Sequence, residues 1–283
     1  MSVPLYTVLI SVEIILSNCK GNKYYTLKDT LQNVYLTIFN GSLDLFFRTL
    51  FYISILTWCY AHRLFYIDNI VFYWALLFLL EDIAFYFEHR IDHYCRLFWA
   101  VHITHHSSNE FNLTTGFRSS VFQPVYRFIY FIPIVLLGFH PLDIVFMYSV
   151  TQTYGILVHT KYINKLPRWF EALFVSPSHH RVHHASNIRY LDKNMGMCLI
   201  IWDKIFGTFQ EELESDPVQY GLTKPLENNS NPINVIFHEW KSIWKDIRKK
   251  TSFINRLSYI FMPPGWSHDG SSKTARELKK ELV

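Results

Sequence analysis

Long apolar stretches alternate with short polar loops along the chain. The four stretches are residues 43–61, 70–88, 119–139 and 142–158. Each approaches the roughly 20 residues that a helix needs to cross a lipid bilayer. Charged side chains such as Arg48, Asp82 and Arg127 interrupt them, and charges inside a span mark functional or interfacial positions. The pattern predicts an all-α integral membrane protein, a helical bundle with about four to five hydrophobic segments.

The two ends of the chain differ from this central pattern. Residues 4–18 are apolar but contain Glu13 and are short for a span, so we expect a marginal membrane segment there. Beyond about residue 210 the chain becomes polar and rich in lysine, although 232–249 places isoleucine and tryptophan on one helical face. We expect that helix to lie on protein or at a membrane interface. The predicted regions are N-terminal membrane segments at 1–69, a histidine-rich core at 70–212 and a partly helical cytoplasmic tail at 213–283.

Composition narrows the class of protein. Half of the residues are apolar and only 18% are charged, which is too apolar for an ordinary soluble domain. The net charge of +4 comes from dispersed residues that flank apolar stretches, which argues against nucleic-acid binding. The four cysteines include no CxxC pair, so neither a disulfide framework nor a thiolate zinc site is expected.

Histidines form three tight groups in this chain. The groups are His89 with His93, then His102, His105 and His106, then His180, His183 and His184. Spacings of three and four residues place the imidazoles of each group on one face of a helix. Neutral imidazole is a common ligand for iron and other divalent metals, and eight imidazoles exceed the needs of one tetrahedral site. We therefore predict two metal ions.

Topology allows the three groups to meet. The stretches 119–139 and 142–158 cross the membrane an even number of times between the second and third groups, which returns the chain to the same side. His159 follows directly and is a ninth candidate ligand. Short loops rich in lysine and arginine stay in the cytoplasm, and such residues gather near the histidines, while the loops 62–69 and 139–142 hold only one. We expect a cytoplasmic histidine-rich cap with two metals, in a multi-pass protein of a bacterial inner membrane or the endoplasmic reticulum.

Three further residues are candidates for supporting roles, because metal-bound imidazoles usually donate their second N–H to a carboxylate or carbonyl. Asp82 shares a helical face with His89 and His93, and Asp92 lies between those histidines. His179 is either another ligand or a hydrogen-bond partner. Four isolated histidines are interpreted as non-ligands: His62, His140, His238 and His268.

The donor set indicates the chemistry. An all-histidine site suits two iron ions that activate dioxygen, whereas hydrolytic zinc needs only three ligands and a water. A site beside the membrane favours a membrane lipid as substrate. Two readings from other classes stay open, a metal transporter and a metal-binding membrane protein without catalysis. Transport would place ligands at mid-membrane depth.

The three groups resemble the HxxxH, HxxHH and HxxHH boxes of the fatty acid hydroxylase and sterol desaturase superfamily of membrane di-iron enzymes. WAVHITHHSSNEFNLTTGFRSS, SPSHHRVHH, DKNMGMCLIIWDKIFGTFQEE and PPGW are most similar to the alkylglycerol monooxygenases within it. The resemblance implies that the eight box histidines bind iron. It also implies hydroxylation of the alkyl carbon beside a glycerol ether oxygen, which releases a fatty aldehyde, with tetrahydrobiopterin as reductant.

One position departs from that pattern. After His159 and Thr160 the animal ether-lipid enzymes are expected to carry a glutamate, where this chain has Lys161. A sterol or fatty-acid hydroxylase or desaturase therefore remains the alternative. Such an enzyme would share the metal site and would take electrons from a donor protein in place of the pterin.

Overall fold

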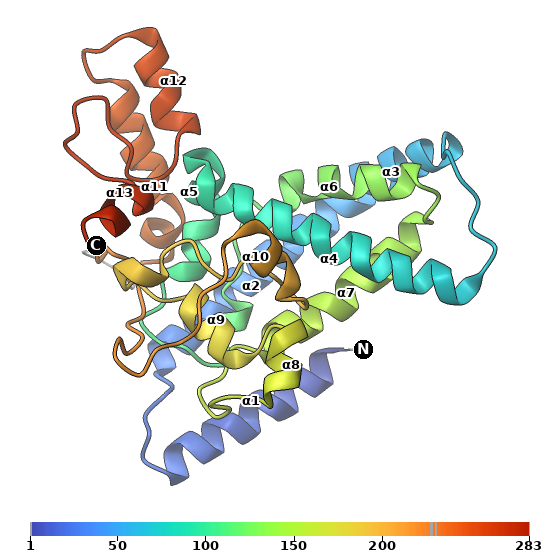
Figure 1. Ribbon diagram of the computed structural model, residues 1–283, viewed down its shortest axis with the longest axis horizontal. Helices are drawn as coiled ribbons and strands as arrows, with labels where there is room; N and C mark the ends of the chain where they lie inside the picture. Colours follow the sequence, from blue (N-terminus) through green and yellow to red (C-terminus); the bar gives the residue numbers. More distant parts are fainter. Residues whose placement is uncertain (1, 227–228, 230, 283) are drawn as a thin grey trace.

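The computed structural model describes residues 2–226, 229 and 231–282, and those residues contain helices and loops but no β-strand (Figure 1). Two isolated β-bridges join Phe174 to Leu199 and Ala185 to Tyr220. The α-helices are α1 (Ser2–Cys19), α2 (Leu27–Phe47), α3 (Ile53–Ala61), α4 (Ile70–Tyr94), α5 (Arg96–His106), α6 (Pro124–Leu136), α7 (Pro141–Leu157), α8 (Arg168–Leu173), α9 (Pro177–His183), α10 (Ile201–Phe206), α11 (Pro232–Ile247), α12 (Phe253–Phe261) and α13 (Ala275–Lys280). The prediction of an all-α fold is confirmed.

Two helical segments are long and apolar enough to cross a membrane. The first runs from Leu27 to Ala61, because a π-helical turn at Arg48–Tyr52 joins α2 to α3 without a break. It therefore begins 16 residues before the predicted stretch 43–61. The second is α4, which begins after the Asn69 cap and carries two of the predicted metal ligands near its C-terminal end.

The other two predicted stretches form a shorter hairpin. Helix α6 has 13 residues and begins at Pro124, because residues 121–123 form a turn before it. Helix α7 has 17 residues, and the loop between them contains Gly138 at a φ of +110°. The prediction that all of 119–139 is one long span is thus wrong. The hairpin still returns the chain to the end of the bundle at which α6 began, as the topological argument requires.

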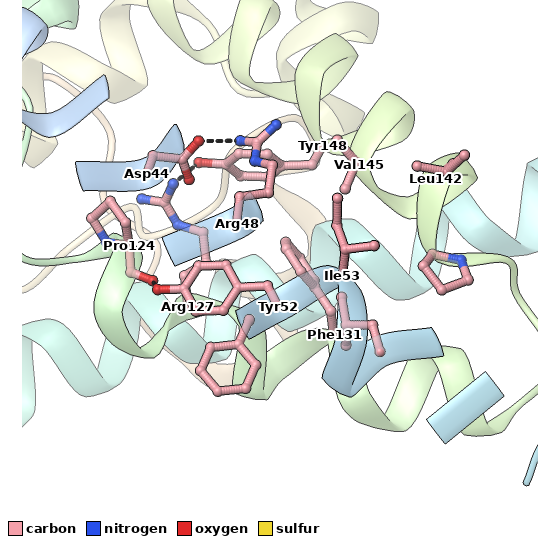
Figure 2. A pocket seen from close by; sticks show the side chains of 13 residues that line it. Asp44, Arg48, Tyr52, Ile53, Pro124, Arg127, Phe131, Leu142, Val145 and Tyr148 are labelled. Atoms are coloured by element: carbon pink, nitrogen blue, oxygen red, sulfur yellow. Dashed lines mark hydrogen bonds and ion pairs between the residues drawn. The ribbon is translucent and has the colours of Figure 1, made fainter. Parts of the chain in front are cut away.

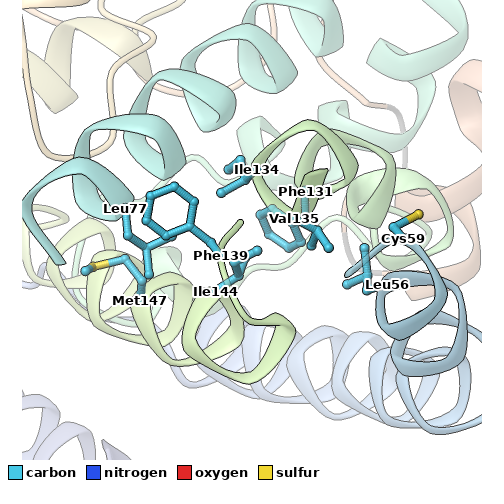
Figure 3. Packing of buried hydrophobic residues seen from close by; sticks show 9 residues of the cluster. All are labelled: Leu56, Cys59, Leu77, Phe131, Ile134, Val135, Phe139, Ile144 and Met147. Carbon is cyan, nitrogen blue, oxygen red and sulfur yellow. The ribbon is translucent and has the colours of Figure 1, made fainter. Parts of the chain in front are cut away.

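An apolar cluster fixes the helices at the end of the bundle distant from the histidines (Figure 3). Leu77 of α4, Val135 of α6 and Ile144 of α7 are fully buried there, together with Phe139 from the intervening loop. Leu56 and Cys59 extend the cluster to α3. Because this packing sets the directions of α4, α6 and α7, their opposite ends converge on the histidine groups.

The first helix braces the histidine end. Glu13, which is buried on α1, accepts hydrogen bonds from the Leu113 amide (3.0 Å) and from the hydroxyls of Thr160 and Tyr25. Tyr6 donates to Thr153 of α7 over 2.8 Å. The N-terminal region, predicted only as membrane segments, therefore also holds the chain on both sides of the histidine site.

Candidate metal centre

Nine histidines meet in two compact groups. Within each group the donor nitrogens lie within 4.8 Å of one another. The first group is His89, His93, His102, His106 and His183, and the second is His105, His159, His180 and His184. All eight box histidines and His159 are included, so the structure places together every residue proposed as a ligand. The boxes interleave, since His183 joins the first two boxes and His105 joins the third.

Local structure explains how each box presents its rings. One helical turn separates the imidazoles of α4, and α5 begins directly after it at Arg96, which brings the second box beside the first. Helix α9 is short and begins with a capping box in which Ser176 binds the His179 amide. The Nδ1 atom of His179 in turn accepts from the Ser176 amide over 3.3 Å. His179 therefore caps α9 and lies outside both groups, so the structure favours its role as a hydrogen-bond partner over that of a tenth ligand.

Backbone carbonyl groups fix the orientation of four rings. The Nδ1–oxygen distances are 2.8–2.9 Å, and the pairs are His89 with Met195, His105 with Arg118, His159 with Gly155 and His183 with Lys193. A carbonyl oxygen can only accept, so each Nδ1 carries the proton. Each Nε2 then holds a lone pair available to a metal, which is the arrangement expected of metal-binding histidines.

The Nε2 atoms that point into the two groups lack a full set of hydrogen-bond donors. In the second group the Nε2 atoms of His159, His180 and His184 lie 2.8–3.2 Å from one another. The proton of His159 is held on its other nitrogen, so these three contacts cannot all be hydrogen bonds. In the first group the Nε2 atoms of His93 and His183 are buried and have no hydrogen-bond partner. Clustered lone pairs of this kind fit a divalent metal in each group.

Burial keeps the imidazoles in the neutral, metal-binding form. It lowers the pKa of all seven group members outside α4, because a buried site disfavours the charged ring. For His105 the pKa falls to about 4. The other six are His102, His106, His159, His180, His183 and His184.

Two carboxylates lie beside the first group. Asp92, predicted from its place between two histidines, has an oxygen 3.7 Å from His102 Nδ1 and accepts hydrogen bonds from Tyr126 (2.7 Å) and Gln123 (2.9 Å). Asp192 was not predicted, and its oxygen lies 3.3 Å from His93 Nδ1. It occupies a left-handed conformation at a φ of +51°, in a loop whose fold the local sequence did not reveal.

The structure engages Asp82 elsewhere than expected. Its carboxylate accepts from the amides of Cys198 (2.9 Å) and Leu199 (3.1 Å) and from the Trp202 indole (2.8 Å). Helical periodicity places Asp82 on the same side of α4 as His89, but its carboxylate contacts residues 198–202 and not an imidazole. Asp82 therefore anchors the segment that begins with Met195, whose carbonyl binds His89.

Asp203 shapes the same loop and was missed in the sequence. It is buried and accepts from the amides of Met195 (2.7 Å) and Gly196 (2.8 Å) and from the Thr208 hydroxyl (2.6 Å). Asn194, at a φ of +55°, adds bonds to the His179 carbonyl and to Gln210. The available signal was the presence of polar residues within the otherwise apolar run 192–208.

Arg118 links the second box to α2. Its side chain is fully buried and donates to the Thr104 carbonyl (3.0 Å), to the Ser107 hydroxyl and to Asn33 (2.9 Å). It also pairs with Asp29 over 3.2 Å. Because its own carbonyl accepts from His105, Arg118 is a further support of the site that the sequence did not predict.

A cavity of about 130 Å³ opens onto both groups. Its wall includes His89 and His102 of the first group, and three members of the second. Arg127 and Tyr148, which are hydrogen-bonded to each other, line this cavity and also a smaller one among α2, α3, α6, α7 and the π-helical turn. Figure 2 shows the smaller cavity, where apolar side chains such as Phe131 lie beside this pair.

Comparison with known proteins agrees with this arrangement. Residues 74–208 match the fatty acid hydroxylase family model. The chain is 37% identical to human alkylglycerol monooxygenase over 99% of its own length and 61% of that protein. It is 38% identical to the Xenopus tropicalis alkylglycerol monooxygenase over 74% of the chain and 45% of that protein. An ornithine lipid hydroxylase of Rhizobium tropici is 26% identical over 51% of the chain and 44% of that protein.

The chain spans between about two fifths and three fifths of the length of these relatives. No solved structure matches it. The matched family segment contains every histidine of both groups and the loop that supports them.

Proposed function

We propose, on the premise that residues 74–208 of this chain form a fatty acid hydroxylase domain, that the protein is a membrane-bound di-iron oxygenase that oxidises a lipid C–H bond. The observation that carries this proposal is the pair of all-histidine groups that face one cavity. Both groups present neutral imidazoles with Nε2 directed inward, and the cavity touches members of each.

The residues present fit two iron ions. Five imidazoles would hold one iron and four would hold the other, without a thiolate or carboxylate among the donors. Nitrogen donors of this type suit iron, and such an iron pair would supply the activation of dioxygen, the co-substrate. The protein positions the donors through backbone carbonyls and keeps them neutral by burial.

The cavity favours a lipid whose reacting carbon lies between polar and apolar surroundings. A volume near 130 Å³ accommodates only a short segment of a ligand, since an engineered cavity of roughly 150 Å³ holds one benzene molecule. Hydroxyl and amide side chains from Ser119, Ser120 and Gln152 line it, which suits a polar headgroup. An alkyl chain would extend past Arg127 and Tyr148 toward the smaller cavity, where Ile53, Leu56 and Phe131 supply apolar surface.

An alkylglycerol ether combines these properties, and the human and Xenopus tropicalis relatives are alkylglycerol monooxygenases by name. Cleavage of the ether would release a fatty aldehyde, with tetrahydrobiopterin as the reductant.

The proposed topology is multi-pass, with the histidine site on the cytoplasmic face of a bacterial inner membrane or the endoplasmic reticulum. Two helical segments are long enough to span, and the loop 62–69 lies at the end of the bundle opposite the histidines (Figure 1). Ligands at one end of α4, rather than at its middle, disfavour the metal-transporter reading.

A second candidate is a sterol or fatty-acid hydroxylase or desaturase that uses an electron-donor protein. Lys161 favours it, because the residue after His159 and Thr160 is a cation where the ether-lipid enzymes are expected to carry an acid. Its ammonium group lies over the rings of Tyr220 (4.7 Å) and Tyr24 (5.0 Å), so it occupies a defined position near the site. A 23% identical sterol desaturase of Schizosaccharomyces pombe also supports this candidate.

The test is an oxygen-dependence assay of the full chain, reconstituted with iron in lipid and supplied with an alkylglycerol and tetrahydrobiopterin. We expect fatty aldehyde, detected by mass spectrometry, only when oxygen and the pterin are both present. His105→Ala should abolish it, and His238→Gln, outside both groups, should not. Iron-loaded protein that forms no aldehyde but oxidises a sterol or fatty acid with a donor protein would support the second candidate. Full activity of His105→Ala would refute both.

A further inference from the structure

The C-terminal hairpin of α11 and α12 projects from the bundle at the end where α5 lies (Figure 1). Buried Arg96, at the start of α5, holds it through Glu239 (2.6 Å), Asp246 (2.7 Å) and Ser242 (2.8 Å). The amide of Arg96 also donates to the Met262 carbonyl over 3.1 Å. Polar bonds at both helices therefore fix which face of the hairpin is turned outward.

The outward face of the hairpin is apolar. On α11, Ile233 is 61% exposed and Trp244 is 56% exposed, and a spacing of 11 residues places them on one side of the helix. On α12, Phe253 and Ile254 are more than 70% exposed, and Phe261 follows at 56%. The inner face of α11, by contrast, packs against α2 in a buried cluster. Large apolar side chains that are exposed on both helices of the hairpin mark an interaction site.

Positive charge accompanies this apolar face. Residues 232–262 contain six lysine and arginine residues and two acidic residues, so they carry a net charge equal to the +4 of the whole chain. Both acidic residues are bound to Arg96 on the inner side. The exposed basic residues are Lys241, Lys245, Arg248, Lys250 and Arg256.

An apolar face flanked by cations is typical of helices that lie in the interface of an anionic membrane. The Arg248 guanidinium lies 4.3 Å from the centre of the Trp244 ring, which joins the basic and apolar surfaces. A second copy of the same hairpin would fit poorly, because five exposed cations would face five others.

We propose that the α11–α12 hairpin is a peripheral membrane anchor whose apolar face lies in the interface of an anionic bilayer while its lysine and arginine residues bind lipid phosphates. Because Arg96 clamps the hairpin to α5, docking also holds the three histidines of that helix at headgroup depth. Membrane anchoring by the hairpin requires only its exposed apolar and basic residues and does not depend on the reaction at the histidine site.

Hydrogen exchange of the full chain tests the anchor, with one chain in each nanodisc. The discs contain either phosphatidylcholine alone or phosphatidylcholine with phosphatidylglycerol, and peptides from 232–262 are followed by mass spectrometry. We expect exchange at least about tenfold slower in the anionic discs, since each basic residue near such a surface contributes on the order of 1 kcal/mol. Replacement of Lys241, Lys245 and Arg256 by glutamine should remove most of this difference.

A matched triple variant controls for total charge. Lys224→Gln, Arg276→Gln and Lys280→Gln remove three exposed cations outside the hairpin, and this protein should keep the full protection. Ile254→Ser with Phe261→Ser should lose protection in both lipids without any change in peptides from α5 and α9. Equal exchange of 232–262 in the two lipids would overturn the proposal. Protection that appears only when two chains share a disc would show that the apolar face binds a second copy of the chain and not lipid, which would also overturn the proposal.

Discussion

His159→Gln offers a direct test of the two-metal arrangement. His159 is one of four donors in the second group, whereas the first group has five. Glutamine keeps a similar volume but replaces an imidazole by an amide, a much weaker ligand for iron. We expect the variant to lose the metal of the second group and to keep the metal of the first.

The size of the loss follows from the donor count. Four-donor zinc sites in small domains bind with roughly 10–16 kcal/mol, or about 2.5–4 kcal/mol per donor, which corresponds to a factor of roughly 10² to 10³ in affinity. The His159 ring is held in place by a 2.8 Å bond to the Gly155 carbonyl.

The assay is competitive dialysis of anaerobically iron-loaded protein against a chelator, with iron per chain measured by mass spectrometry. At a chelator concentration where the wild type keeps two irons, His159→Gln should keep one, and His140→Gln, outside both groups, should keep two. His93→Gln leaves four donors in the first group and should lose less. Retention of both irons by His159→Gln would refute its role as a ligand, and loss of both would show that the groups form one cluster.

Three further outcomes follow from the structure. Gly116→Ala should weaken binding of the second metal by about 10- to 100-fold in the same chelator assay, because the new Cβ would lie 3.0 Å from His159 Nδ1 and 3.2 Å from the Cα atom of Ile156. Gly41→Ala, where the new Cβ has no neighbour within 4 Å, should leave the affinity unchanged. Arg118→Lys should lower the free energy of unfolding by about 2–4 kcal/mol, because lysine keeps the pairing with α2 but loses most of the five hydrogen bonds of the guanidinium group. Thermal denaturation measures this change, and an unchanged midpoint temperature would contradict it. Metal-free protein should lose stability as the pH falls below about 6.5, because the histidines of the unfolded chain take up protons there, whereas burial lowers the pKa of those in the folded protein. Each histidine should lower the free energy of unfolding by up to about 1.4 kcal/mol per pH unit. A free energy of unfolding that stays constant from pH 7.5 to 5 would refute this account.

The sequence predicted which histidines lie together because their spacing is local. A separation of three or four residues on a helix determines which face a ring occupies, whatever the rest of the fold does. The placement of His159 beside the other groups followed from the return of the α6–α7 hairpin, although that hairpin is shorter than predicted. The assignment of histidines to groups did not follow, because it depends on how α5 and α9 pack against α4.

The sequence did not reveal the supporting residues, because their hydrogen-bond partners are distant in sequence. Asp82 lies on the predicted face of α4, but the amides that it accepts from come 116 and 117 residues later. Asp192 reaches His93 only because its backbone adopts a left-handed conformation. Glu13 was interpreted as a charge that weakens a membrane segment, and instead it fixes the loop after α7.

The four rings held by main-chain oxygen have a consequence for how this centre can change over evolution. A carbonyl belongs to the peptide backbone, so replacing the side chain of Met195 or Lys193 leaves the acceptor for His89 or His183 in place. Only a substitution that moves the backbone, such as loss of Asp203, would remove it. The orientation of these imidazoles therefore depends little on the side chains of the surrounding loops, and the lining of the adjoining cavity can diverge while the arrangement of the imidazoles persists.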